Sequence, residues 1–285
     1  MPPRPGRRRL LAFASDLGDA YAAQVKGVLA RSIDPGWTVD LTHDLPAHGI
    51  AEAAFVVRAI GVRFPAGTVY LIVVDPGVGG SRAPVVLACR DGSLLVGPDN
   101  GVLYPLSVAL GGATGYRIDP ARLGGGSRVG TTFDGRDLFA PAAVRLFLGT
   151  PPSRLGPRID PVRYELPVPE RTRSSAQGEV VHADRFGNLI TNIPSEWVPR
   201  GTDSVKLTFQ RGRPHRLPFA TSYAAIGQGR LGALGSSFGT VEVAVGEGRA
   251  SAQLRVGVGA RVVVRWGPPH RRASRTVNSA RPRRG

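Results

Sequence analysis

The chain has 285 residues, 42% of them hydrophobic, which is enough for one large or two modest domains with a substantial core. Much of its formal charge of +16 lies in Arg-, Pro- and Ser-rich ends, residues 1–9 and 269–285, which we expect to be disordered and to attract polyanions such as RNA only non-specifically. No aromatic-interleaved basic patch is present, so nucleic acid is not the expected main partner. No apolar run reaches the roughly 20 residues that cross a bilayer, and Leu10–Ala14 is too short for a signal-peptide core, so we expect a cytoplasmic protein.

The first predicted strand covers Leu10–Ser15 and ends at Asp16. Gly18 interrupts the pattern, and residues 21–30 then show helical spacing of apolar side chains. Asp16 is therefore expected at the carboxyl end of a strand and ahead of a helix. Two interpretations stay open, because a carboxylate at this place either caps the helix or faces a ligand.

A second strand and a second helix follow. Trp37–Leu41 is the predicted strand, and it closes on His43, where a lone histidine is more often a hydrogen-bonded structural residue than a catalyst. Ile50–Phe64 carries its apolar side chains on one helical face, which predicts a helix packed against the sheet.

The segment Thr68–Arg82, TVYLIVVDPGVGGSR, is the centre of the pattern. Val69–Val74 is an almost unbroken apolar run, as expected for a strand buried on both faces. Pro76 cannot continue a sheet ladder, so Asp75 is expected at the carboxyl end of a central strand, where open α/β sheets place their ligands. Arg82 follows within reach of the same crevice. The alternative is that Asp75 caps the turn and Arg82 is a solvated charge.

A hairpin is predicted next, with strands Val85–Cys89 and Leu94–Val96 joined by an Arg-Asp-Gly turn. The single cysteine, Cys89, excludes an intrachain disulfide and a cysteine-based zinc site, and we expect a buried structural thiol. Gly97–Gly101 is a turn cluster, interpreted as backbone punctuation. Strand, helix, strand and hairpin in this order predict an α/β domain with a mostly parallel central sheet.

The next dense polar stretch is TTFDGRD at residues 131–137. A helix is predicted over Leu138–Leu148, with Asp137 as its cap and Asp134 in the loop before it.

The texture of the chain predicts two domains. We expect an α/β N-terminal domain over residues 10–165, a Pro-, Arg- and Ser-rich linker over 166–177, and a smaller all-β domain over 178–268. In the last of these, short β-branched runs alternate with Gly-rich turns, which is typical of a barrel or sandwich.

Five stretches carry a further signal when taken together and in order. They are Ser15-Asp16 with Tyr21 and Lys26-Gly27, DPGVGGSR at 75–82, TTFDGRDLFAPAA at 131–143, DRFGNLITNI at 184–193, and Ser237-Phe238-Gly239 followed by Glu242 and Gly248-Arg249-Ala250. In this combination, over roughly residues 10 to 267, the chain resembles the S-adenosyl-L-methionine (SAM) hydroxide adenosyltransferases, relatives of the fluorinase and chlorinase.

The resemblance implies hydrolysis of SAM to adenosine and methionine, without a cofactor or metal, by attack of activated water on ribose C5′. It also implies a homotrimer whose sites lie between the N-terminal domain of one subunit and the C-terminal domain of the next. By resemblance, Asp16 would hold the ribose hydroxyls and Asp184 the methionine amino group. The other substrate-binding residues that it implies are Tyr21, Phe186, Asn188, Ser237, Phe238, Arg249 and the backbone of Ala250.

By the same resemblance, Asp75 and Arg82 fall on two members of a water-activating triad, and the third is Asp134, where the family usually has His. Asp75 could accept a proton from water, and Arg82 could stabilise the developing hydroxide. Asp134 could act as a second acceptor, or pair with Arg82 and keep it in place. The loop between Asp16 and Tyr21 is also shorter than in the family.

Three alternatives remain open. The first is a halide-using adenosyl transferase, which the carboxylate of Asp75 beside the proposed nucleophile argues against. The second is a metal-dependent hydrolase using Asp16, Asp75, Asp134 and His43, although their spacing is not compact. The third is a non-catalytic protein that binds an adenosyl ligand, if Asp134 makes the site inactive.

Overall fold

The computed structural model describes residues 9–123, 132–210 and 212–267, and the chain divides into two compact units at Pro167/Val168. The predicted disordered ends, apart from Arg9, lie outside the described residues, as does Thr131 of the TTFDGRD motif. Within the described ranges, every helix is too short or too polar to cross a lipid bilayer. The two units are described one at a time.

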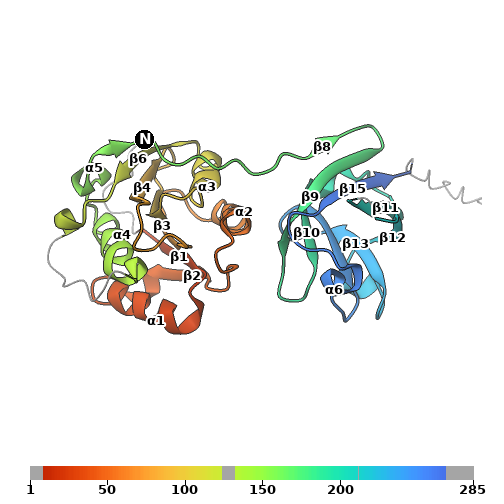
Figure 1. The fold of residues 1–285 in the computed structure, drawn as a ribbon, viewed down its shortest axis with the longest axis horizontal. Coiled ribbons are helices and arrows are strands. Elements are labelled where there is room, and N and C mark those ends of the chain that lie inside the picture. Colours follow the sequence, from red (N-terminus) through yellow and green to blue (C-terminus); the bar gives the residue numbers. More distant parts are fainter. Residues whose placement is uncertain (1–8, 124–131, 211, 268–285) are drawn as a thin grey trace, which may run out of the picture. The chain divides into compact units, whose positions relative to one another are not determined.

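A seven-stranded mixed sheet forms the centre of the first unit, in the order β2-β1-β3-β5-β4-β6-β7 (Figure 1). Three of its strand pairings are parallel and three are antiparallel. The predicted α/β class is confirmed. The parallel pairings join neighbouring strands in one half of the sheet, β2-β1-β3-β5. The strands are β1 (Leu11–Ser15), β2 (Thr38–Thr42), β3 (Val69–Val73), β4 (Pro84–Cys89), β5 (Leu94–Pro98), β6 (Ala113–Arg117) and β7 (Arg158–Ile159).

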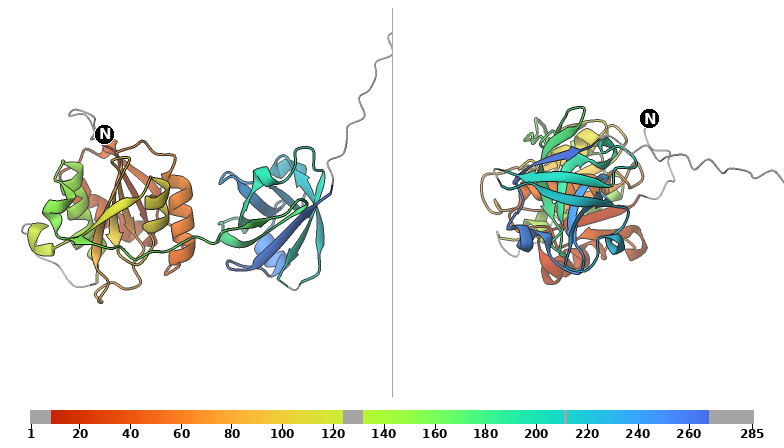
Figure 2. Two further views of the ribbon diagram at one scale, coloured as in Figure 1. Left: turned by 90° about the horizontal axis from the view of Figure 1, so that it is seen from above. Right: turned by 90° about the vertical axis from the view of Figure 1, so that its right-hand side faces the viewer.

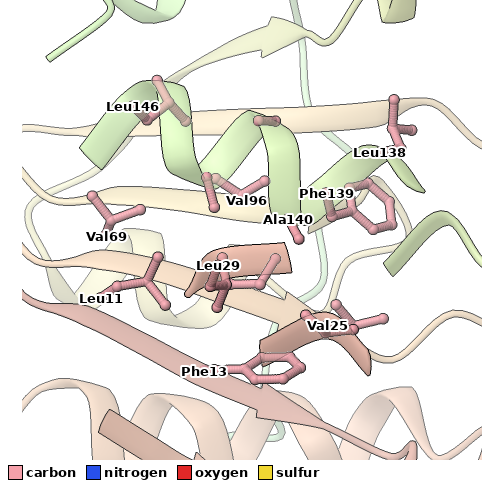
Figure 3. Close-up of a cluster of buried hydrophobic side chains, with 14 of the residues drawn as sticks. Leu11, Phe13, Val25, Leu29, Val69, Val96, Leu138, Phe139, Ala140 and Leu146 are labelled. Carbon is pink, nitrogen blue, oxygen red and sulfur yellow. The ribbon is translucent and has the colours of Figure 1, made fainter. Parts of the chain in front are cut away.

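Helices cover both faces of this sheet. Helices α1 (Gly18–Leu29) and α4 (Ala140–Phe147) pack over β1 and β3 on one face, where Figure 3 shows their buried side chains gathered. Helix α2 (Ile50–Gly61) lies on the opposite side of the sheet from α4 (Figure 2), and it packs with α3 (Tyr104–Ala109). All five residues of β3 are buried, as its unbroken apolar sequence predicts.

The chain enters α4 through a π-helical turn, η3 (Gly135–Phe139), which differs from the predicted helix over 138–148. Asp137 is not a helix cap, because it lies inside this turn and its carboxylate accepts hydrogen bonds from Arg136 at 2.7 and 3.0 Å. The remaining helical segments of the unit are η1 (Pro35–Trp37), η2 (Pro120–Leu123) and α5 (Pro152–Leu155). Cys89 is buried at the end of β4, and burial raises the pKa of its thiol to about 12.

In the described part of the second unit, seven strands close a barrel in the order β10-β14-β13-β12-β11-β15-β9, with β9 pairing back to β10. Strand β8 (Glu170–Arg171) extends the sheet beside β9, so strands begin within the stretch predicted as a linker. The barrel strands are β9 (Ser175–Ala183), β10 (Leu189–Pro194), β11 (Ser204–Phe209), β12 (His215–Ala220), β13 (Leu231–Gly235), β14 (Thr240–Val245) and β15 (Arg261–Trp266), with short helical segments η4 (Ser195–Trp197), η5 (Tyr223–Ala225) and α6 (Ala250–Leu254) between them.

Candidate active site

Asp75, Arg82 and Asp134 form one buried ion-pair cluster in the first unit. The Nε of Arg82 donates to the two carboxylate oxygens of Asp75 at 2.9 and 3.1 Å, and Nη2 donates to both Asp75 and Asp134. The side chains of Arg82, Asp75 and Asp134 are 12%, 6% and 3% exposed. Arg82 is therefore not a solvated charge, and the alternative interpretation of this pair is wrong.

The loop after β3 is built to return Arg82 to Asp75. β3 ends at Val73, Pro76 follows in the loop, and backbone bonds from Val78 to Asp75 and from Gly80 to Gly77 fold the loop back. A Cβ added at Gly77 would lie 3.1 Å from the Cγ of Arg82, so a glycine there lets the arginine side chain pass.

Asn100 holds the end of β3 from the other side. Its side-chain amide donates to the carbonyl of Val74 at 2.8 Å, one residue before Asp75, and its Oδ1 accepts from the N–H of Val102 at 3.2 Å. The sequence interpretation took the turn containing Asn100 as punctuation. An Asn two residues beyond a strand end, at the edge where ligands gather, is the signal that could have identified it.

Asp134 reaches the cluster because the π-helical turn packs tightly on β3. It stands at the start of this turn, and a Cβ on the following Gly135 would lie 3.1 Å from the Cγ1 of Val73. The ring of Phe139, at the other end of the turn, lies 5.2 Å from the guanidinium carbon of Arg82. Single π-helical turns occur frequently at functional sites, because the extra residue re-aims nearby side chains.

The guanidinium of Arg82 stays charged in this setting. Burial alone would lower the pKa of Arg82, but its hydrogen bonds to Asp75 and Asp134 outweigh burial and raise the pKa above its ordinary value. With both carboxylates ionised, the cluster carries one positive and two negative charges. Its net negative charge disfavours the entry of an anion and leaves carboxylate lone pairs to accept a proton.

Asp16 lies at the same edge of the sheet as this cluster. Strands β1 and β3 are parallel neighbours with Ser15 opposite Val73, and the N–H of Asp16 donates to the carbonyl of Val73 at 3.3 Å. Asp16 does not cap α1, whose N-cap is Leu17; instead its Oδ2 accepts from the N–H of His48 at 3.3 Å. Burial raises the pKa of Asp16 above its ordinary value and the charge of Asp75 adds to this, whereas the His48 N–H opposes it.

Tyr21 contributes an aromatic surface on α1. It is 57% exposed and meets the ring of Phe133 edge-on, with centroids 5.7 Å apart. The guanidinium of Arg136 lies over the ring of Phe133, 5.0 Å from its centroid, and donates to Gln24 at 2.8 Å. Phe133 and Arg136 were not among the predicted site residues, although both lie inside the TTFDGRD motif.

In the second unit, Asp184 is oriented by its own loop. Its Oδ1 accepts from the N–H groups of Phe186 and Asn188 at 2.9 Å each, and its Oδ2 accepts from the side-chain amide of Asn188 at 3.0 Å. Gly187 adopts a φ of +81°, which closes the turn. The carboxylate is therefore fixed in place before any ligand arrives.

A second loop lies directly beside that turn. Arg249 donates to the carbonyl of Arg185 at 2.8 Å, and the N–H of Ser251 donates to the carbonyl of Gly187 at 2.9 Å. These bonds bring Arg249 and Ala250 next to the Asp184 loop. Phe186 is 60% exposed at the tip of that loop, with the guanidinium of Arg185 4.8 Å from its ring centroid.

Ser237 and Phe238 occupy the turn between β13 and β14. The ring of Phe238 meets His182 edge-on at 6.0 Å. Nearby, the buried Glu242 accepts a hydrogen bond from the hydroxyl of Tyr223 at 2.8 Å. Burial raises the pKa of Glu242, the hydrogen bond from Tyr223 opposes this, and the charge of Asp184 raises it further. Tyr223 was missed by sequence reasoning, since only a fold brings it to Glu242.

Comparison with known proteins agrees with this arrangement. Residues 11–156 match the family described as the SAM hydroxide adenosyltransferase N-terminal domain, and residues 178–263 match the corresponding C-terminal domain. The chain belongs to the SAM hydroxide adenosyltransferase family.

Relatives of two kinds are found for this family member. Proteins named (R)-S-adenosyl-L-methionine hydrolase from Salinispora tropica and Thermus thermophilus are 38% and 37% identical, over 90% and 86% of this chain and 98% and 95% of theirs. A fluorinase from Nocardia brasiliensis is 27% identical over 78% of this chain and 85% of its own. A solved structure, an uncharacterized conserved protein from Thermotoga maritima, matches with a TM-score of 0.81 and 30% identity over 90% of this chain and 99% of that one.

Among the described residues of this family member, Asp16, Asp75, Asp134 and His43 do not gather into a group that could hold a metal ion. Across the described residues, no group of three or more His, Cys, Asp or Glu side chains is placed to hold an ion. The guanidinium of Arg82 already occupies oxygens of Asp75 and Asp134 that a cation would need. His43 is engaged elsewhere, by Ser15 and Asp40.

Proposed function

We propose that this protein hydrolyses SAM to adenosine and L-methionine by attack of an activated water on ribose C5′. The observation that carries the proposal is the buried Asp75–Arg82–Asp134 cluster at the end of β3, beside Asp16 at the end of β1. Membership of the family, and 37–38% identity to proteins named as (R)-SAM hydrolases, support the same substrate.

The reaction is a displacement at carbon that needs no general acid. The water oxygen forms a bond to C5′ while the C5′–S bond breaks. The electron pair of the C5′–S bond goes to sulfur, which leaves as a neutral thioether. The water proton passes to Asp75. Because an anionic nucleophile meets a sulfonium cation, charge is lost in the transition state, and a site with little water favours the reaction.

Asp75 and Arg82 have complementary parts in this scheme. Asp75 is the proton acceptor, since its Oδ1 accepts one hydrogen bond from Arg82 and retains a second lone pair, whereas Oδ2 accepts from both Nε and Nη2. Arg82, which keeps its charge, stabilises the oxygen as hydroxide character develops.

Asp134 is a positioning residue in this proposal. The sequence left two roles open for Asp134, and its hydrogen bond supports pairing with Arg82, because Nη2 is shared between Asp75 and Asp134. A carboxylate at this place holds the same terminal nitrogen of the guanidinium that Asp75 holds, and so fixes the fork.

The substrate contacts proposed from the family follow the two units. In the first, Asp16 takes the ribose hydroxyls and Tyr21 offers an aromatic surface. In the second, Asp184 takes the methionine ammonium, and the remaining contacts are Phe186, Asn188, Ser237, Phe238, Arg249 and the backbone of Ala250. We also propose the family's homotrimer, which light scattering on the full chain would test.

A halide-using reaction is the second candidate, because fluorinases are among the relatives. The net negative charge of the cluster disfavours this reaction, because the two carboxylates would repel a halide bound beside Arg82.

The test is a product assay with purified protein and separate samples of (R)- and (S)-SAM in ¹⁸O-labelled water, with and without chloride, fluoride or a chelator. We expect adenosine carrying ¹⁸O at its 5′-hydroxyl, unchanged by chelator, from the (R) form named for the relatives. A 5′-halo-adenosine would support the halide reaction, and loss of activity in chelator would support a metal enzyme. Tight binding of SAM without product would support a binding protein.

A further inference from the structure

A chain of polar contacts runs from the end of β1 to the surface of the first unit. The hydroxyl of Ser15 lies 2.9 Å from Nδ1 of His43, and Nε2 of the same ring lies 3.1 Å from Oδ1 of Asp40. The other oxygen of Asp40 accepts from Lys26 at 3.0 Å. The proposed reaction uses none of these four side chains.

The imidazole of His43 is held tightly within this series of polar contacts. The side chain of His43 is 7% exposed, and its ring lies 4.5 Å from the ring of Phe13, which is fully buried in β1. Nε2 contacts Asp40 without an aligned hydrogen bond to any described residue. The contact of Nε2 with Asp40 and the contact of Nδ1 with Ser15 together fix the orientation of the ring.

The protons can be assigned from the charges. Burial acts to raise the pKa of Asp40, but Lys26 and His43 outweigh burial and lower the pKa, so Asp40 is a carboxylate at neutral pH. A carboxylate facing Nε2 favours the tautomer with its hydrogen on that nitrogen. Nδ1 is then an acceptor, and the Ser15 hydroxyl donates to it.

Ser15 and His43 also join the ends of β1 and β2 through their backbones. The N–H of Gly18 donates to the carbonyl of His43 at 3.0 Å, and the N–H of Leu45 donates to the carbonyl of Ser15 at 3.2 Å. Between these two bonds lies Asp16, whose carboxylate accepts from His48 on the segment that follows His43. The backbone of Asp16 and the His48 N–H that its carboxylate accepts are therefore both held by segments that the Ser15–His43 contact joins.

We propose that His43 is a positioning residue for the ribose-side carboxylate: through Nδ1 and Ser15, it fixes the strand end that presents Asp16. The inference rests on the proposed contact between Asp16 and the ribose hydroxyls. Asp75 and Arg82 lie in the loop between β3 and β4, so His43 acts on binding of the ribose more than on the displacement itself.

Two substitutions separate the two nitrogens of the ring. His43→Asn keeps a polar atom near the position of Nδ1, whereas His43→Gln keeps one near the position of Nε2. The readout is calorimetric binding of adenosine and of 2′,3′-dideoxyadenosine, which lacks the hydroxyls that Asp16 would hold. We expect the wild type to prefer adenosine, His43→Asn to retain most of this preference, and His43→Gln to lose about tenfold of it, the effect of one hydrogen bond to a charged group.

Ser15→Ala should match His43→Gln, and the double variant Ser15→Ala/His43→Gln should lose no more than either alone. In turnover of SAM, the same variants should raise KM and leave kcat within about threefold, if one hydrogen bond is at stake.

Each contrary outcome has its own meaning. If both His43 variants weaken adenosine and dideoxyadenosine equally, His43 is only a structural residue and the inference is wrong. If both keep the wild-type preference, the contact with Ser15 does not place Asp16. If the wild type itself fails to distinguish the two nucleosides, the ribose contact of Asp16 is wrong and the inference falls with it. Absence of SAM turnover together with a nucleoside preference that follows the Asn/Gln difference would instead overturn the proposed hydrolysis alone.

Discussion

Replacing Asp134 with Asn is the sharpest perturbation of the ion-pair cluster, because it removes one charge and almost no volume. Asp134 shares the Nη2 of Arg82 with Asp75, and its side chain is 3% exposed. A hydrogen bond to a charged group contributes roughly 1.5–3 kcal/mol. If Arg82 must be held during the displacement, a loss of this size lowers kcat by about 10- to 150-fold. KM should change by less than about threefold, because the proposed ribose contacts lie on β1.

The assay is adenosine release from SAM, with kcat and KM measured separately. Asp119→Asn is the matched control, because Asp119 also pairs with an arginine, Arg122, at 3.4 Å, but there the two side chains are 42% and 51% exposed. An exposed pair of this kind contributes about 0–1 kcal/mol, so the control should keep its activity. An Asp134→Asn enzyme whose kcat equals that of the control would refute the positioning role. Asp134→His, the residue usual in the family, should stay active and gain a pH limb near a histidine pKa of about 6.5.

Three further predictions concern Asn100, Asp16 and Glu242. Asn100→Ala leaves the Val74 carbonyl unpaired, so we expect a stability loss of about 1–3 kcal/mol in denaturant unfolding, and an unchanged unfolding midpoint would contradict this role. The pKa of Asp16 is raised, so the folded protein binds the Asp16 proton more tightly than the unfolded chain does, and the ionised carboxylate lowers stability at neutral pH. Asp16→Asn should therefore raise Tm at pH 7 while weakening substrate binding. The gain in Tm should vanish as the pH falls below the ordinary Asp pKa of about 3.9. The ionised carboxylate of Glu242 also lowers stability at neutral pH, because burial and the charge of Asp184 raise its pKa. Glu242→Gln should therefore raise Tm at neutral pH but not in acid. A Tm that falls at neutral pH would show that the fold needs the charge of Glu242.

Local sequence was sufficient where one physical effect dominated. An apolar run without polar alternation has only one stable place, between two covered faces, and β3 lies there with all five residues buried. Pro76 and the glycines after it fix the strand end, so the position of Asp75 could be predicted from neighbouring residues alone. The hairpin of β4 and β5 was equally predictable, because its turn is local.

Local sequence failed where partners come from far along the chain. The π-helical turn depends on Gly135 packing against Val73, and nothing in residues 135–139 alone favours it over the ordinary helix predicted there. Strands β12 and β13 pair in parallel within an otherwise antiparallel barrel, and Pro218 and Gly232 interrupt their apolar patterns. The interpretation of His43 as a hydrogen-bonded residue is confirmed, but its partners Ser15 and Phe13 are on another strand and could not be named from local sequence.

The register of β1 and β3 gives a geometric reason for the proposed substrate. Ser15 lies opposite Val73, so the carboxylates that follow, Asp16 and Asp75, leave the sheet from neighbouring parallel strands. Such strands are about 4.8 Å apart. In a ribose, C5′ is attached to C4′, beside the ring carbons C3′ and C2′ that carry the hydroxyls, so the hydroxyls and C5′ are separated by a distance of the same order. Two adjacent strand ends can therefore contact one ribose, with Asp16 anchoring its hydroxyls and Asp75 facing the carbon to be attacked. A ligand with a longer spacer between its diol and its electrophilic carbon would not fit this register, and a 5′-homologated SAM analogue should consequently bind without being hydrolysed.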